Sequence, residues 1–160
     1  MSCFSVPRKL LESDDVRDFI SGVDVVDAWV HRRAHRSMRQ GTAVVYVVYS
    51  GRIIAGLYAL SAHSVLRTDV EGGWLKRNSL EHISAILLGM LGVDVHFQGQ
   101  GLGASLLRDA ILRSVEVSGQ IGARALLVDP ANSEASAFYR HFRFKELGGG
   151  QPGSSCRSAS

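Results

Sequence analysis

The chain of 160 residues suits a single domain, and its hydrophobic content of 46% is ample for a buried core. No apolar run reaches the ~18 residues of a membrane span, and residues 1–11 lack the apolar region of a signal peptide. Cys3 and Cys156 are the only cysteines, which excludes a disulfide framework and favours a reducing cytoplasm. The net charge of +3 is mild, but basic residues are concentrated in residues 31–39.

The first part of the chain predicts two helices and then an antiparallel hairpin. Asp14 indicates the start of the first helix, and apolar residues at helical spacing predict a second helix over 24–38. Residues 42–49 and 52–61 are rich in strand-forming side chains and are separated by a turn, so they predict two paired strands. Residues 63–78 are mixed and polar and predict a loop that can include a short strand.

The second part predicts a parallel strand–helix–strand unit and a short final helix. Residues 83–95 are almost continuously apolar, as in a strand buried on both faces. The next helix has a predicted buried stripe made of Leu102, Leu106, Leu107, Ala110, Ile111 and Val115. Residues 123–128 predict a strand parallel to the first, because such crossovers are right-handed. The final helix has a predicted apolar side of Ala135, Phe138, Tyr139 and Phe142, and Phe144 begins a further strand.

From Gly148 onward the sequence is rich in glycine and serine, and it has too few apolar residues to order itself. We therefore expect one domain over residues 1–147 and a flexible tail over residues 148–160.

The most informative stretch of the chain is Gln98-Gly99-Gln100-Gly101-Leu102-Gly103. It lies between the apolar strand and an amphipathic helix. Three glycines let a ligand approach the backbone closely, and the unpaired amides at a helix start favour phosphate, as does the helix dipole. The stretch predicts a site for a phosphorylated cofactor, and the competing interpretation is a simple turn into the helix.

Three classes of phosphate loop compete for this stretch. A P-loop needs a lysine, and none lies nearby. A dinucleotide loop fits the spacing of Gly99, Gly101 and Ala104, but too few residues follow for a doubly wound sheet. The third pattern, Gln/Arg-x-x-Gly-x-Gly/Ala, is satisfied by Gln98, Gly101 and Gly103 at the end of a long buried strand.

In this third pattern the sequence resembles the GNAT superfamily of acyl-coenzyme-A-dependent N-acetyltransferases. Asn132-x-x-Ala135-x-x-Phe138-Tyr139, followed by Phe144, is similar to the closing motif of that superfamily. A narrower resemblance, to the TacT-type toxins of bacterial toxin–antitoxin pairs, is carried by residues 19–22, 27–30, 55–61, 91–94, 98–103 and 106–110. It covers roughly residues 10–146. It implies an α/β (α+β) fold with a mixed, mostly antiparallel sheet that is flanked by helices on both faces and splayed at the central strand.

Three features depart from the pattern of those toxins. Met90 stands where they usually carry arginine, and Arg143 stands where glycine usually precedes the phenylalanine. The final strand of the family falls within the predicted tail, which leaves the closing of the sheet and any dimer contact made there open.

The resemblance implies acetyl-coenzyme A (acetyl-CoA) as the acetyl donor, with no metal. Backbone amides of the glycine stretch would hold the pyrophosphate, and the Val93 amide would polarise the thioester carbonyl. The implied cofactor residues are Leu91, Val93, Gln98, Gly99, Gln100, Gly101, Gly103, Ala104 and Asn132. For Asn132, capping of the final helix is an equal alternative.

Tyr139 stands at the position of the family's general acid. A phenol with an ordinary pKa of ~10 is protonated at neutral pH and can donate to a leaving thiolate. The competing interpretation is an aromatic side chain that only packs. No general base is assigned, because the amine of an aminoacyl ester is largely deprotonated near neutral pH. His96 is predicted to be structural or solvated. For Asp94, a role as a base and a role as a hydrogen-bonding turn residue are equal alternatives.

The acceptor implied by the resemblance is the free amino group of aminoacyl-tRNA, whose acetylation blocks translation. Arg32, Arg33, Arg36, Arg39, Lys76 and Arg77 would track the tRNA phosphates, and the alternative is a solvated helix face. A ribbon-helix-helix antitoxin and a homodimer, without a membrane, are the other implied partners. Two alternative functions are a GNAT enzyme for small amines or protein amino groups and a non-catalytic coenzyme-A-binding module.

Overall fold

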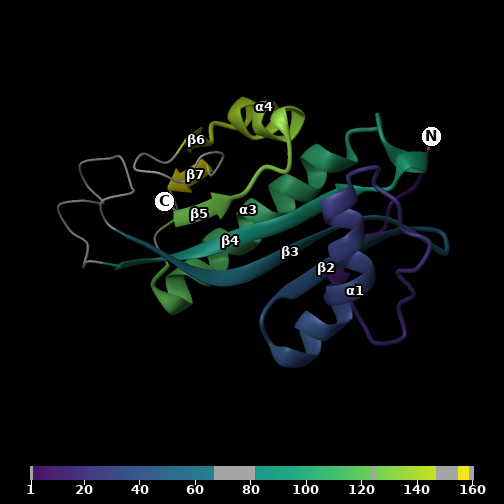
Figure 1. Cartoon of the computed structure of the whole chain (residues 1–160), viewed down its shortest axis with the longest axis horizontal. Helices are drawn as coiled ribbons and strands as arrows, with labels where there is room; N and C mark the ends of the chain where they lie inside the picture. Colours follow the sequence, from purple (N-terminus) through teal and green to yellow (C-terminus); the bar gives the residue numbers. More distant parts are fainter. Residues whose placement is uncertain (1, 67–81, 124, 147–154, 159–160) are drawn as a thin grey trace. The chain divides into compact units, whose positions relative to one another are not determined.

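The structure is a computed structural model that describes residues 2–66, 82–123, 125–146 and 155–158 (Figure 1). The chain divides into two compact units, one formed by Met1–Ser61 with Gly89–Ile111 and the other by Ala62–Leu88 with Leu112–Ser160. Strands β3 (Ile53–Leu66) and β4 (His82–Val93) and helix α3 (Leu102–Ile121) each contribute residues to both units. No helix of the described ranges is long and apolar enough to cross a membrane.

The first unit is an antiparallel sheet in the order β1-β2-β3-β4. Its remaining elements are β1 (Arg8–Lys9), α1 (Asp24–Gln40), β2 (Val44–Ser50) and the short 3-10 helix η2 (Val95–Phe97). The predicted hairpin is confirmed, with Tyr46 opposite Tyr58 and Ser50 opposite Ile53. The predicted second helix is confirmed as α1, which buries Val26, Val30 and Ala34.

Two glycines let helices approach this sheet on both of its faces. A Cβ added to Gly56 would lie 2.8 Å from Leu106 Cδ1 on α3, whereas one added to Gly92 would lie 3.0 Å from Val26 Cγ1 on α1. The side chains along β2 and β3 alternate between the two faces, which agrees with a helix on each face. On one face, the core cluster that includes residues of α1 also contains Val45, Val47, Leu57 and Ala59. The intervening Tyr58 bonds Asp109 on α3.

The segment after β1 is not the first helix that the sequence predicted. Residues 11–23 form turns and irregular structure. Of the three apolar residues that a helix would place on one face, Val16 and Phe19 are buried, whereas Ile20 is 49% exposed. Asp14 does not cap a helix. Its carboxylate accepts two hydrogen bonds from the Arg8 guanidinium, at 2.8 and 2.9 Å, one from the Leu11 amide and one from the Tyr49 hydroxyl. This cluster ties the irregular segment to β1 and β2.

The Asp14 cluster makes stability depend on pH. The hydrogen bond from Arg8, helped by those from Leu11 and Tyr49, holds the pKa of the Asp14 carboxyl far below its usual range, against the opposing effect of burial. Because this pKa is lower in the folded than in the unfolded chain, the stabilisation is full above about pH 4 and is lost as the pH falls further.

Asp14→Asn is therefore expected to lower the free energy of unfolding by about 2 kcal/mol at pH 7, with a smaller difference from the wild type at about pH 2, because the stabilisation is lost only as the pH falls towards the lowered pKa of the folded chain. Denaturant titrations at both pH values measure this. Asp15→Asn is the control, because Asp15 pairs with Arg17 at an exposed site and such pairs contribute little to stability. A difference for Asp14→Asn that stays constant with pH would contradict the explanation.

The second unit has the strand order β4-β5-β7-β6. It contains β5 (Ala125–Val128), α4 (Ser133–His141), β6 (Lys145–Glu146) and β7 (Ser155–Ser158). The predicted parallel pair is confirmed, in register from Ala85 opposite Ala125 to Leu88 opposite Val128. Ile83, Ala85, Ala125 and Leu127 form the core cluster of this unit.

Three predictions for these later elements need correction. Ser155–Ser158 form β7, which pairs antiparallel with β5 and β6, so the prediction of a flexible tail is wrong for these four residues. Residues 148–154 and 159–160 lie outside the described ranges. Residues 63–66 belong to β3 rather than to a loop. Val115 is 43% exposed and leaves the predicted stripe of α3, whereas Leu102, Leu106, Leu107 and Ala110 are buried as expected.

Candidate active site

The last residues of β4 offer a backbone edge. Pairing with β5 ends at Leu88, yet β4 continues to Val93. The Asp94 amide donates to Ala55 O on β3 at 2.8 Å. Because backbone groups alternate in direction along a strand, those of Val93 and Leu91 point away from β3. An extended ligand could pair with this edge as an added strand would.

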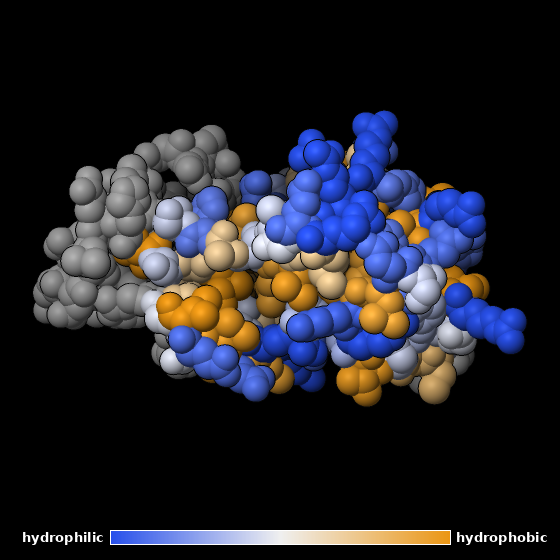
Figure 2. Space-filling view, turned by 90° about the horizontal axis from the view of Figure 1, so that it is seen from below, coloured by the Kyte–Doolittle hydropathy of each residue, from blue (hydrophilic) through white to orange (hydrophobic). Residues whose placement is uncertain are grey.

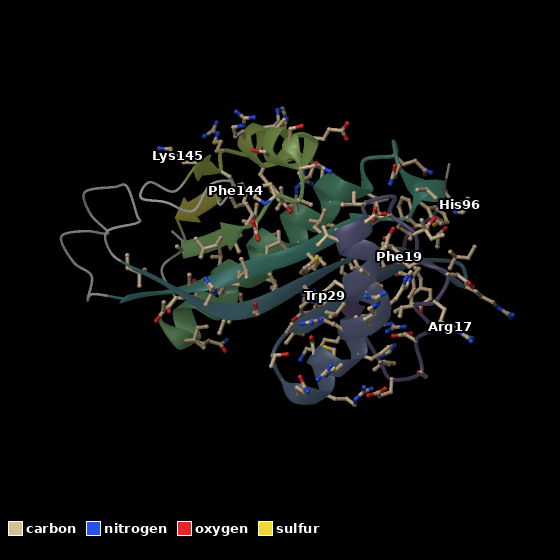
Figure 3. All side chains as sticks on the ribbon, in the orientation of Figure 1. Arg17, Phe19, Trp29, His96, Phe144 and Lys145 are labelled. Carbon is tan, nitrogen blue, oxygen red and sulfur yellow. The ribbon has the colours of Figure 1, made fainter. Side chains whose placement is uncertain are left out.

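Asp94 holds the end of β4 in place. Only 2% of Asp94 is exposed, and its side chain accepts hydrogen bonds from the amides of His96 (2.9 Å) and Ile20 (3.1 Å). Burial alone would raise the pKa of this carboxyl, but these hydrogen bonds outweigh burial and keep the pKa low. The predicted role of Asp94 as a turn residue is confirmed, because it caps η2. His96 Nδ1 lies 2.7 Å from Asp94 Oδ1, and the His96 side chain is largely exposed (Figure 3).

Gln98 has a structural role that the sequence did not reveal. Its side-chain amide donates to Ser21 O at 2.8 Å and to Val93 O at 2.9 Å. Both hydrogens of the amide are therefore used within the protein, and neither remains for the predicted contact with phosphate. Gln98 instead joins the segment before α1 to the end of β4. Asp27 continues this connection into α1 by accepting from the amides of Ser21 and Gly22.

The glycine stretch has the backbone of an anion cradle. Gly99 and Gly101 have φ values of 78° and 80°, and a Cβ on either would have no atom within 4 Å. The left-handed backbone thus requires glycine at both positions, as a turn would, and the open space beside them leaves room for a ligand. The 20-residue helix α3 starts at Leu102, so the free amides and positive dipole end of its first turn, which includes Gly103 and Ala104, adjoin this space. The Gln100 side-chain oxygen accepts from the Ser2 amide at 3.2 Å.

Tyr139 lies in the second unit, near the end of α4. It is 6% exposed and its ring packs edge-on against Phe144, with ring centroids 5.4 Å apart. Burial, with a smaller contribution from Asp129, raises the pKa of its hydroxyl well above the usual value. Among the described residues, none forms a hydrogen bond with this hydroxyl, which stays protonated and available as a donor. Tyr139 therefore packs in the interior, as one interpretation predicted, and its hydroxyl also keeps the proton that a general acid needs.

The two ends of α4 fix the placement of Tyr139. At the start, the Asn132 side chain accepts from the Ala135 amide at 2.8 Å, so its predicted capping role is confirmed. At the end, the Phe144 amide donates to Tyr139 O at 3.1 Å and the Arg143 amide donates to Arg140 O at 3.0 Å. These are the two bonds of a Schellman cap, and the contact of Phe144 with Tyr139 is its usual apolar partner.

The predicted basic residues of α1 share the outer side of that helix. Arg32, Arg33, Arg36 and Arg39 are all exposed, and hydrophilic colouring is dense over α1 in Figure 2. Arg39 also pairs with Glu12 at 3.1 Å. Lys76 and Arg77 lie outside the described residues. The structure therefore brings Leu91, Val93, residues 98–104 and the α1 arginines into one unit, and it places Asn132 and Tyr139 in the other.

Comparison with known proteins identifies the class of the chain. No protein-family model matches it. A tRNA-acetylating toxin of Mycobacterium tuberculosis is 41% identical over 145 residues, which cover 91% of this chain and 87% of that protein. Among solved structures, AtaT complexed with acetyl-methionyl-tRNAfMet has a TM-score of 0.89 at 23% identity, covering 98% of this chain and 95% of that one. AtaTR bound with AcCoA has a TM-score of 0.84 at 22% identity, covering 98% and 94%.

The fold is therefore that of the GNAT-type acetyltransferase toxins, as the glycine stretch and the closing motif indicated. The sequence identity to the mycobacterial toxin shows more than a shared fold. It is 41% and extends over 91% of this chain. The chain belongs to the family of tRNA-acetylating toxins.

Proposed function

We propose that this protein is an acetyl-CoA-dependent N-acetyltransferase toxin that acetylates the free amino group of aminoacyl-tRNA and so blocks translation. The observation that carries the proposal is the continuity of the β4 edge with the cradle at Gly99 and Gly101. The edge suits the peptide-like pantetheine arm, and the cradle suits the pyrophosphate. Membership in the family of tRNA-acetylating toxins supports the acceptor.

Each residue has a defined task in this proposal. Acetyl-CoA supplies an activated acetyl group as a thioester. The Val93 amide polarises the thioester carbonyl, and Leu91 aligns the arm through its backbone. The Tyr139 hydroxyl donates a proton to the departing thiolate. Asn132 holds the start of α4, and Gln98 holds the end of β4. Gln100, Gly99, Gly101, Gly103 and Ala104 line the cradle.

The arginines of α1 supply the proposed contacts with the tRNA backbone. Phosphate contacts release counterions, so binding falls steeply as the salt concentration rises. A ribbon-helix-helix antitoxin, a homodimer and a cytoplasmic location complete the proposal. They are supported by the resemblance to the TacT-type toxins.

Incubation with labelled acetyl-CoA and charged tRNA tests the function. We expect label on the aminoacyl group, at a rate that falls steeply between low and moderate salt because α1 contacts phosphates. Equal transfer to free amino acid esters, with little dependence on salt, would favour a small-amine acetyltransferase. Binding of acetyl-CoA without transfer to any amine would favour the non-catalytic module.

A further inference from the structure

A second basic cluster lies at the end of α4, apart from the arginines of α1 in the sequence. Arg140, His141, Arg143 and Lys145 fall within six residues, and all four are exposed. In Figure 3, Lys145 lies at the edge of the ribbon beside α4, where nitrogen-tipped side chains gather. We call Arg140, Arg143 and Lys145 the α4 basic cluster.

The helix dipole explains only part of the α4 basic cluster. Cations in the last turn of a helix interact favourably with its negative end, and this accounts for Arg140 and His141. Arg143 and Lys145 follow the helix, so the dipole does not require them. Within the described side chains, none of the three members has a carboxylate partner, whereas Arg8, Arg17 and Arg39 each have one. Among the side chains that the structure describes, the cluster is therefore a group of exposed positive charges without a paired carboxylate.

Arg143 is kept at an unfavourable backbone position. Its φ is 70°, and it is the only non-glycine among the described residues with a positive φ. The position after the cap of a Schellman motif usually carries glycine, because a side chain there crowds the backbone. The hydrogen bonds of the cap need no side chain at residue 143. A strained backbone position that carries an exposed guanidinium is a candidate functional position.

We propose that the α4 basic cluster is a second phosphate-binding surface for the tRNA substrate. The inference rests on the proposed function, because it takes aminoacyl-tRNA as the substrate. Arg140 follows Tyr139 directly in the last turn of α4, and Arg143 and Lys145 follow within six residues of Tyr139, so the cluster adjoins the proposed acid in the chain. A tRNA whose charged 3′ end reaches Tyr139 brings backbone phosphates to that same turn. The tRNA is favoured over an acidic protein segment, because the proposed reaction itself requires tRNA phosphates close to Tyr139.

The variant Arg143→Gly removes the positive charge at residue 143 and keeps the backbone hydrogen bonds of the cap. Glycine relieves the left-handed strain, so the melting midpoint of the variant is expected to rise by about 2–4 °C. If the cluster binds phosphate, the affinity for uncharged tRNA is expected to fall by about 3- to 10-fold at low salt, and the slope of log affinity against log salt to decrease by about one. Fluorescence anisotropy with labelled tRNA measures both quantities. Acetyl-CoA affinity, measured by calorimetry, is expected to stay unchanged.

Two further proteins complete the experiment. The triple variant Arg140→Gln, Arg143→Gly, Lys145→Gln is expected to reduce the salt slope by about two to three. Arg52→Gln is the matched control, because Arg52 is an exposed arginine beside the β2–β3 turn. It removes one positive charge from the other unit and should leave the slope within error of the wild type.

The outcomes distinguish this inference from the proposed function. If the wild type acetylates aminoacyl-tRNA while both cluster variants keep its tRNA affinity and salt slope, the cluster has no role in tRNA binding and the inference is overturned. Weaker binding of an acidic protein partner, with tRNA affinity kept, also overturns it. If the wild type acetylates no aminoacyl-tRNA, the proposed function fails, whatever the variants bind.

Discussion

Tyr139→Phe is expected to lower the rate of acetyl transfer at least about 100-fold while leaving acetyl-CoA affinity nearly unchanged. Phenylalanine keeps the ring that packs on Phe144 but removes the proton donor, so the thiolate would leave without neutralisation. The structure strengthens this expectation, because the raised pKa of Tyr139 keeps the hydroxyl protonated at every pH up to at least about 10. Rapid-quench measurement of transfer with saturating acetyl-CoA separates the chemical step from binding.

Tyr46→Phe is the control for the loss of a buried tyrosine hydroxyl. Tyr46 is 8% exposed and stacks on Tyr58 in the first unit, and it has no proposed role in transfer. This variant is expected to lose some stability but to transfer acetyl at close to the wild-type rate. Wild-type rates for Tyr139→Phe would leave Tyr139 as a packing residue only, which its contacts with Phe138 and Phe144 would then explain.

Asp94→Ala is expected to reduce the free energy of unfolding by about 3 kcal/mol, the largest stability effect that we foresee for a single side chain. The alanine would leave the amides of Ile20 and His96 without the acceptor that Asp94 provides. It would also release the turn that leads from β4 into the glycine stretch, so acetyl-CoA affinity should fall as well.

The exposed Asp18 provides a matched control for Asp94. Asp18→Ala removes an equal charge close to Ile20 in the sequence, and its effect should stay within about 0.5 kcal/mol, as is usual at exposed sites. Chemical denaturation gives the stability of each protein, and calorimetry below the unfolding transition gives the affinity for acetyl-CoA. If Asp94→Ala were as stable as Asp18→Ala, the carboxylate would not be the group that holds the end of β4.

Periodic patterns predicted most of the regular elements. Helix α1, the β2–β3 hairpin and the buried side of α3 follow from apolar spacing, because burial imposes the period of the helix or strand. The parallel pairing of β4 with β5 follows from the strand–helix–strand order of the elements. The amino-acid composition gave a wrong prediction where backbone pairing between strands decides the structure. Ser155–Ser158 have few apolar side chains, but their backbone pairs with β5 and β6, and backbone pairing leaves little trace in a single sequence.

The site was predictable where a local motif determines the geometry. The glycine stretch and the cap at Asn132 depend on neighbours a few residues away, so the sequence contains the necessary information. Asp14 and Gln98 depend on contacts across many residues, from Tyr49 to Asp14 and from Gln98 to Ser21. Aspartate is common both at helix starts and in ion-paired turns, and nothing near Asp14 in the chain distinguishes the two.

The end of β4 has a consequence for how the protein behaves without a ligand. A strand that runs on past its neighbour, as β4 does from Gly89 to Val93, exposes donors and acceptors that can template pairing with another chain. Many proteins protect such edges with proline, with charged side chains or with a covering loop. If acetyl-CoA binds as proposed, the substrate itself completes the sheet, and the resistance of the toxin to aggregation depends on the acetyl-CoA concentration of the cell.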